Sequence, residues 1–83
     1  MTTLQEQVIL LRLKLGQFTL SRHARQRMQE RLVTHEDLFA LGRTGHCSVT
    51  EGGRWTIIGQ DLSGDSLTAI VAWKAGVFVV TLY

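Results

Sequence analysis

The sequence predicts an α+β fold, in which N-terminal helices pack on one face of a four-stranded antiparallel sheet. Apolar residues in the first half of the chain repeat at helical spacing, whereas after Gly45 they follow a period of two. Three short glycine-containing connections divide the second half, as expected of β-hairpins. With 83 residues and no proline, the chain fits one ordered domain, residues 1–83.

The first predicted helix covers residues 4–15 and carries more than one apolar stripe. Its main stripe is formed by Leu4, Val8, Leu11 and Leu15. Ile9 and Leu13 form a second stripe, although a surface helix needs only one. The helix is therefore either deeply packed or shared with another chain, and Gly16 is suited to end it.

Residues 17–20 form a short segment with β propensity that leads into two further helices. Ser21 is a good N-cap for a helix from residue 22 to about residue 32. Thr34 and Asp37 have the spacing of a capping box, with Asp in place of Glu or Gln. They open a short third helix, which we expect Gly42 to end.

Four strands are predicted, at about 46–50, 54–61, 66–73 and 77–83. Short hairpins join antiparallel neighbours, so the expected sheet is a simple meander. In the last strand, strict alternation gives two faces, one with Phe78, Val80 and Leu82, the other with Val77, Val79, Thr81 and Tyr83. Both faces are largely apolar, which favours a central strand or one covered on both sides.

The composition of the chain argues against several classes of protein. Cys47 is the only cysteine, so no disulfide can form within the chain and a reducing, cytoplasmic location is expected. The apolar run at residues 8–15 is far shorter than the roughly 20 residues of a membrane span, and its charge order does not suit a secretory signal. We therefore expect no membrane association. The formal charge of +2 is compatible with a polyanionic partner.

Positive charge is concentrated in the second predicted helix. Seven of the nine basic residues are arginines, and four of these lie between Arg22 and Arg31. On a helical wheel, Ala24, Met28 and Leu32 form the core-facing stripe. His23, Arg27 and Arg31 form a parallel row beside it, at the boundary between core and solvent.

This basic row suits phosphodiester chemistry. A histidine can act as acid or base near neutral pH, and guanidinium groups hold phosphoryl oxygens through paired hydrogen bonds. The alternative is structural, because arginines on a short helix are often solvated and His23, just after an N-cap, is often a structural hydrogen-bonding residue.

Other candidate residues carry weaker signals. A lone cysteine and histidines without ligand spacing predict no metal or cofactor, and Cys47 lacks a recognisable activating partner. Gly52 and Gly53 read as a hairpin pair rather than a phosphate loop. Arg54 can join the basic row only if its strand borders the second helix.

Residues 17–83 resemble a bacterial family known only as domain of unknown function 4258. The segment FTLSRHARQRMQERLVTHEDL contains the family's Ser/Thr-x-His-Ala-x-x-Arg-Met-x-x-Arg helix, followed by an acidic-capped helix. The segments GRWTIIGQDLSGDSLTAIVAW and VVTLY resemble its hairpin and closing strand. The position after Arg31 is usually glycine in that family and is Leu32 here, and residues 1–16 are an additional N-terminal amphipathic helix without a counterpart.

The family is similar to the RelE and BrnT toxins of the barnase-, colicin- and RelE-like group. This resemblance implies a helix pair against an antiparallel sheet, metal-independent RNA cleavage, RNA as substrate with or without the ribosome, and a cognate antitoxin. It implies catalytic roles for His23, Arg27 and Arg31, and a looser one for Tyr83 at the C-terminal position. Arg54 and Thr81 are lesser candidates for phosphate binding, together with Arg27 and Arg31.

Three hypotheses follow. The first is a toxin-like, metal-independent endoribonuclease. The second is a non-catalytic module of the same fold that binds protein or RNA. The third is a homo-oligomer held by the stripe of Leu4, Val8, Leu11 and Leu15, which is also the surface where an antitoxin could dock.

Overall fold

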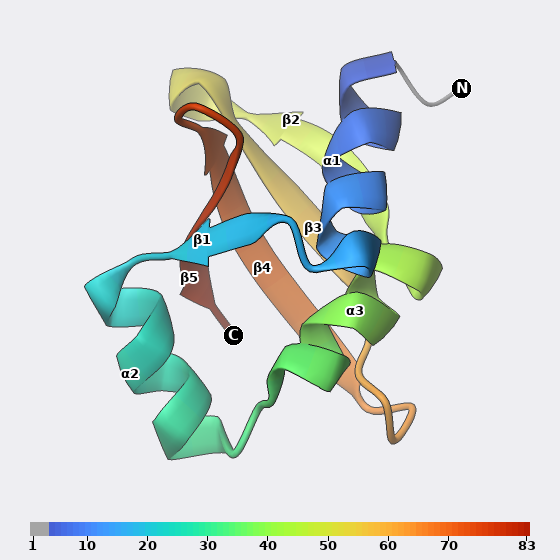
Figure 1. Ribbon diagram of the computed structural model, residues 1–83, viewed down its shortest axis with the longest axis vertical. Coiled ribbons are helices and arrows are strands. Elements are labelled where there is room, and N and C mark those ends of the chain that lie inside the picture. The colour runs from blue at the N-terminus through green and yellow to red at the C-terminus, as the bar shows by residue number, and fades with distance from the viewer. Residues whose placement is uncertain (1–3) are drawn as a thin grey trace.

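The computed structural model describes residues 4–83 and places three α-helices against a five-stranded sheet (Figure 1). In chain order the elements are α1 (Leu4–Leu15), β1 (Phe18–Leu20), α2 (Arg22–Arg31), α3 (His35–Thr44), β2 (His46–Thr50), the 3-10 turn η1 (Glu51–Gly53), β3 (Arg54–Gln60), β4 (Ser66–Trp73) and β5 (Val77–Leu82). The α+β class is confirmed, and the four predicted strands are correct to within one residue at each end. Residues 1–3, which the predicted domain and its N-terminal segment include, lie outside the described residues.

The sheet has the strand order β1-β5-β4-β3-β2. Strands β2 to β5 form the expected antiparallel meander, but β1 pairs with β5 in parallel, Phe18 opposite Val77. The prediction of a purely antiparallel, four-stranded sheet is therefore wrong. Residues 17–20 have β propensity, but a three-residue strand is too short to show alternation and its partner lies at the other end of the sequence, so no local signal predicts that it joins the sheet.

The core lies between the helices and one face of the sheet. The buried side chains of β3, β4 and β5 alternate along each strand and pack with buried residues of all three helices. The fully buried members of this core include Ile9, Leu13, Leu38, Leu41, Ile57, Leu67, Val71, Val79 and Leu82. The predicted packing of the helices on one face of the sheet is thus observed.

Helix α1 is an integral part of this core. Ile9 and Leu13 are fully buried, and α1 packs directly on α3. Gly16, with φ of 78°, ends α1 as predicted, because the left-handed conformation after a helix favours glycine. Within residues 4–83, no helix is long and apolar enough to cross a membrane.

Gly42 does not end α3, contrary to the prediction. The helix continues to Thr44, and Gly45 is its C-cap. A Cβ atom on Gly42 would lie 2.6 Å from the backbone nitrogen of Lys14, so the glycine is there to let α1 and α3 approach closely. A glycine needed for close helix packing and one needed for a helix end look the same in the sequence.

Strand β5 is central, as its apolar alternation predicts, but the predicted assignment of its faces is wrong at one end. A bulge shifts the register, so that Val71 pairs with Val79 and Ile70 with Thr81. Leu82 therefore joins Val77 and Val79 on the core face, and Thr81 lies on the opposite face with Ile70.

Candidate functional site

Helix α2 starts beside β5, at the place where β1 ends. The hydroxyl of Ser21 accepts a hydrogen bond from the backbone N–H of Ala24 at 2.9 Å, which makes Ser21 the predicted N-cap. The same hydroxyl donates to the carbonyl oxygen of Val80 at 2.6 Å, and the backbone N–H of Ser21 donates to that of Val79 at 2.9 Å. These bonds fix the start of α2 against the edge of β5.

Arg27 extends this attachment to the end of β5. Its Nε–H donates to the carbonyl oxygen of Leu82 at 3.2 Å, and its side chain is half-buried. Strand β1 pairs with β5 only as far as Val79. Beyond that residue, Ser21 and Arg27 donate hydrogen bonds to the carbonyl groups on the free edge of β5. One of the five guanidinium N–H donors makes this contact, which leaves the terminal groups for other partners.

The residues of the predicted basic row lie on the solvent-facing side of α2. Ala24 and Met28 are buried on the core side, whereas His23 and Arg31 are exposed. The third predicted core residue, Leu32, is instead 86% exposed, because it is the C-cap and turns the chain away with φ of 56°. The row therefore runs along α2 past the end of β5.

Tyr83 lies beside this row through its backbone. It follows Leu82, whose carbonyl oxygen Arg27 contacts, and its side chain is exposed. Its backbone is held by hydrogen bonds in both directions with Thr68 on β4. Because paired residues share a face of the sheet, its side chain lies with that of Thr68 on the face opposite the buried Leu82, away from α2. The row and the backbone at the end of β5 form one surface, the α2–β5 surface, defined by His23, Arg27, Arg31 and the carbonyl group of Leu82.

Two lesser candidates lie apart from the α2–β5 surface. Thr81 is half-buried on the sheet face opposite the core, where it pairs with Ile70. Arg54 begins β3, and β4 lies between that strand and β5, so the strand of Arg54 does not border the strand that carries α2.

Charge on α2 is arranged against the helix dipole. The first turn of α2 contains Arg22, His23 and Arg25 and no acidic residue, although the partial positive charge there favours acidic side chains. The helix thus accumulates positive charge where an anion is the favourable companion.

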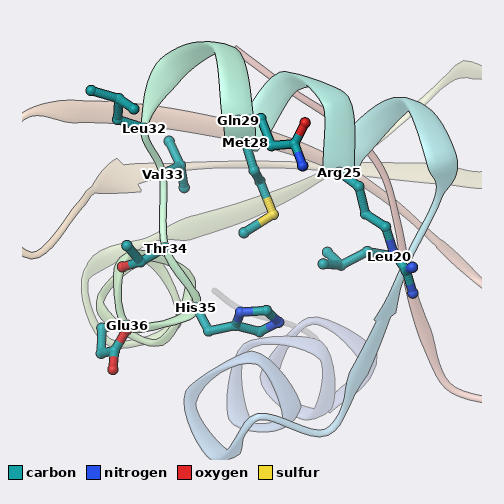
Figure 2. Close-up of a pocket in the computed structure, with 9 residues that line it drawn as sticks. All are labelled: Leu20, Arg25, Met28, Gln29, Leu32, Val33, Thr34, His35 and Glu36. Atoms are coloured by element: carbon teal, nitrogen blue, oxygen red, sulfur yellow. The ribbon is translucent and has the colours of Figure 1, made fainter.

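A groove lies on the other flank of α2, between this helix and the start of α3. Its volume is about 700 Å³, and Figure 2 shows its lining: Leu20, Arg25, Met28, Gln29, Leu32, Val33, Thr34, His35 and Glu36. Met28 and Leu20 form an apolar floor, with the side chains of Arg25 and His35 beside it. The ring of His35 stacks on Phe18, with centroids 5.9 Å apart.

Arg25 and His35 both line this groove, but the sequence analysis does not predict that the two side chains lie close together. The helical wheel places Arg25 and Gln29 on one flank of α2, which is the available signal. The pairing with His35 depends on the turn at Leu32 and Val33 that brings α3 back beside α2, and this turn is not visible in the sequence pattern.

The structure gives the burial of Cys47 and the grouping of potential metal ligands. Cys47 is buried on β2, and this burial, with a smaller effect of the charge of Glu6, raises the pKa of its thiol to about 11. Among the described side chains, which exclude those of residues 1–3 and Glu51, no group of three or more His, Cys, Asp or Glu could hold a metal ion.

No protein-family model, no curated protein and no solved structure matches the chain. The resemblance to domain of unknown function 4258 and to RelE-like toxins therefore stays a prediction from the motif residues. What is known of the site comes from its own geometry.

Proposed function

We propose that the protein is a toxin-like, metal-independent endoribonuclease that binds RNA on the α2–β5 surface. The observation that carries the proposal is the exposed row of His23 and Arg31 on either side of Arg27, which is itself held by the carbonyl group of Leu82 at the end of β5. Successive members of the row are one helical turn apart, about 5.4 Å along the axis, so they form a continuous positive strip.

In this proposal, Arg27 and Arg31 bind the phosphate groups of the RNA. A guanidinium group offers a planar fork of donors that matches two phosphoryl oxygens. Arg27 keeps its terminal nitrogens for this purpose while its Nε–H holds Leu82. The basic first turn of α2 adds a positive potential that a phosphate would relieve.

The reaction requires an acid and a base but no metal. The RNA 2′-hydroxyl oxygen attacks the adjacent phosphorus, which forms a 2′,3′-cyclic phosphate and breaks the bond to the 5′ oxygen. One group takes the 2′-hydroxyl proton and another protonates the departing 5′ oxygen. In our proposal His23 serves as acid or base, a solvent water takes the other proton-transfer role, and the arginines stabilise the charge that develops on the phosphoryl oxygens.

The proposal includes the cytoplasm as the place of action and an antitoxin as a partner. RNA targets of this kind are cytoplasmic, and an antitoxin would have to cover the α2–β5 surface or block RNA from reaching it. Ribosome-bound RNA is one form that the substrate can take.

A second candidate function is RNA binding without cleavage. It is favoured by the exposure of His23 and Arg31, which lie on an open helix face and do not line the α2–α3 groove. Binding needs only exposed positive charge, whereas acid–base catalysis is favoured by an enclosed site that excludes water.

Cleavage of an end-labelled RNA in the presence of EDTA tests the proposal. We expect the wild-type protein to leave 2′,3′-cyclic phosphate ends, and His23→Ala to reduce the rate by about 100-fold or more. Arg43→Ala, which removes an exposed arginine from the last turn of α3, is the matched control and should cleave like the wild type.

The two candidate functions give different results in this assay. Inert wild-type protein that binds RNA, with an affinity that falls steeply with salt and is weakened by Arg31→Ala, supports the second candidate. Cleavage that survives His23→Ala unchanged contradicts the catalytic role of His23. Growth arrest on induction of the wild type, but not of His23→Ala, is the corresponding test in cells.

A further inference from the structure

Helix α1 carries apolar side chains on two opposite faces. Ile9 and Leu13 are fully buried on α3 and the sheet, whereas Leu4, Leu11 and Leu15 are 77%, 51% and 58% exposed. With the half-buried Val8, these three leucines form an outer stripe whose spacing is four, three and four residues. This is the alternation of d and a positions in a coiled-coil heptad, the pattern of a helix that packs against another helix.

A hollow lies beside one end of this outer stripe. Leu4, Gln5 and Val8 line it together with Trp73, at the end of β4, and its volume is about 560 Å³. Trp73 is 45% exposed, although tryptophan is among the most costly side chains to leave in water. At the other end of the stripe Leu11 and Leu15 stand exposed. The surface therefore has a hollow at one end and exposed apolar side chains at the other end, and side chains of this kind can fill such a hollow.

We propose that a second copy of this chain docks on the outer stripe, with the two α1 helices antiparallel about a two-fold axis. The spacing of the stripe is the same when read in either direction, so every position meets an apolar one. Leu4 faces Leu15 of the partner subunit, and Val8 faces Leu11 of the partner subunit. Each copy thereby inserts its exposed leucines beside the other copy's hollow, as a self-complementary two-fold interface requires.

Charge favours a second copy in this orientation. The basic residues of α1, Arg12 and Lys14, lie in its last turn, whereas the residues that flank the stripe in its first turn are the neutral Gln5 and Gln7; Glu6 lies on the other side of the helix, where its charge acts on Cys47. Antiparallel packing sets the positive last turn of each helix against the first turn of the other and opposes the two helix dipoles favourably. Parallel packing would place the positive ends side by side.

Arg12 flanks the stripe without crossing it. Its guanidinium carbon lies 5.1 Å from the centroid of the Trp73 ring, in a cation–π contact. This contact holds the half-buried Arg12 against Trp73, beside the hollow and not within the row of apolar side chains.

The size of the stripe sets the strength of the dimer. It consists of four side chains on a short helix and one tryptophan, far fewer than the roughly 20–30 residues that each partner contributes to a standard interface. The dimer therefore forms reversibly and its population depends on protein concentration. This inference is independent of the proposed RNA chemistry, because the α2–β5 surface contains no residue of α1.

Sedimentation equilibrium over a wide concentration range tests the proposal. We expect the wild-type average mass to rise from that of one chain to that of two, and Leu11→Asp to remain monomeric throughout. The matched control is Leu62→Asp, since Leu62 is also exposed, at 61%, but lies in the β3–β4 connection away from the stripe. It should dimerise like the wild type.

A second variant distinguishes loss of the dimer from loss of the fold. Leu4→Glu adds an acidic residue at the start of α1, where the helix dipole favours it, so α1 keeps its stability while the stripe acquires a charge. We expect this variant to have the wild-type circular dichroism and to be monomeric. A wild type that stays monomeric at every concentration overturns the proposal, as does a dimer that both Leu4→Glu and Leu11→Asp leave intact.

Disulfide trapping tests the antiparallel arrangement. In a Cys47→Ala background, a chain with Leu4→Cys should cross-link to a chain with Leu15→Cys when the two are mixed and oxidised. Neither should cross-link efficiently to itself, because identical positions lie at opposite ends of the interface. Efficient self-linking of the Leu4→Cys chain would contradict the antiparallel orientation.

Discussion

Arg27 on α2 donates its Nε–H to the carbonyl oxygen of Leu82, 3.2 Å away, and so covers the free edge of a strand that β1 leaves unpaired. This contact gives Arg27 a structural role whatever its role in RNA chemistry. An unpaired carbonyl at a strand edge is both an energetic cost and a point where another chain can add.

Arg27→Ala should lower the free energy of unfolding by about 1–2 kcal/mol, because the Leu82 carbonyl loses a donor. Arg31→Ala removes an exposed arginine from the same row and should change it by less than about 0.5 kcal/mol. Urea denaturation of both variants measures the difference. Equal losses would show that the contact with Leu82 contributes nothing specific. Loss of RNA cleavage in Arg27→Ala is therefore ambiguous, which is why His23 and Arg31 are the residues to test.

Leu32→Gly should stabilise the protein by about 0.5–1 kcal/mol. Leu32 ends α2 with φ of 56°, a conformation that costs a residue with a Cβ about 1–2 kcal/mol, while glycine pays a smaller entropy cost. The exposed leucine side chain offers little burial in compensation. Thermal unfolding measures the change, and Gln29→Gly, inside the same helix, is the control that should destabilise.

Asp37 should make stability dependent on acid pH. Its carboxylate accepts hydrogen bonds from the backbone N–H groups of Thr34 and Leu62, at 2.8 and 3.0 Å. The backbone bond from Thr34 has the largest effect and lowers the pKa of this carboxyl below its ordinary value; burial opposes it, and the bonds from the Leu62 backbone and the Thr34 hydroxyl lower it further.

Because the folded pKa of Asp37 lies below the unfolded one, its contribution is complete above the unfolded value of about 3.9 and disappears as the pH falls through the folded value. Asp37→Asn should be less stable than the wild type at pH 6, and the difference should shrink below about pH 4. Urea titrations at several pH values measure it. A difference that stays constant down to pH 2 would contradict this linkage.

Cys47 should react slowly with thiol reagents in the folded protein. Burial raises its thiol pKa from 9.0 to about 11, so its thiolate fraction near neutral pH is about 100-fold lower. Leu62→Cys in a Cys47→Ala background supplies an exposed thiol for comparison. Similar labelling rates for the two at pH 7.5 would contradict the burial of Cys47.

Local signals account for what the sequence predicts correctly. Ser21 and the Thr34–Asp37 box mark the starts of α2 and α3, and both caps are observed. Alternation and glycine-containing turns locate β2 to β5. The core stripe of Ala24 and Met28 follows from helical spacing, and with it the exposed row that includes His23 and Arg31.

Features that depend on distant pairing are not predictable in the same way. The parallel pairing of β1, the bulge at Val80 and the contact between Arg27 and Leu82 each join residues far apart in the sequence, or disrupt a regular pattern. The α2–α3 groove likewise depends on a left-handed turn at Leu32, where glycine would have given a signal.

The place of β5 in the sheet determines when the protein can fold during its synthesis. Residues 77–82 come last in chain order among the five described strands, but they lie between β1 and β4. Until they emerge from the ribosome, β1 has no partner and the apolar side of α2 has no strand to cover it. The nascent chain can form helices and the earlier hairpins, but these surfaces stay exposed until β5 has left the ribosome.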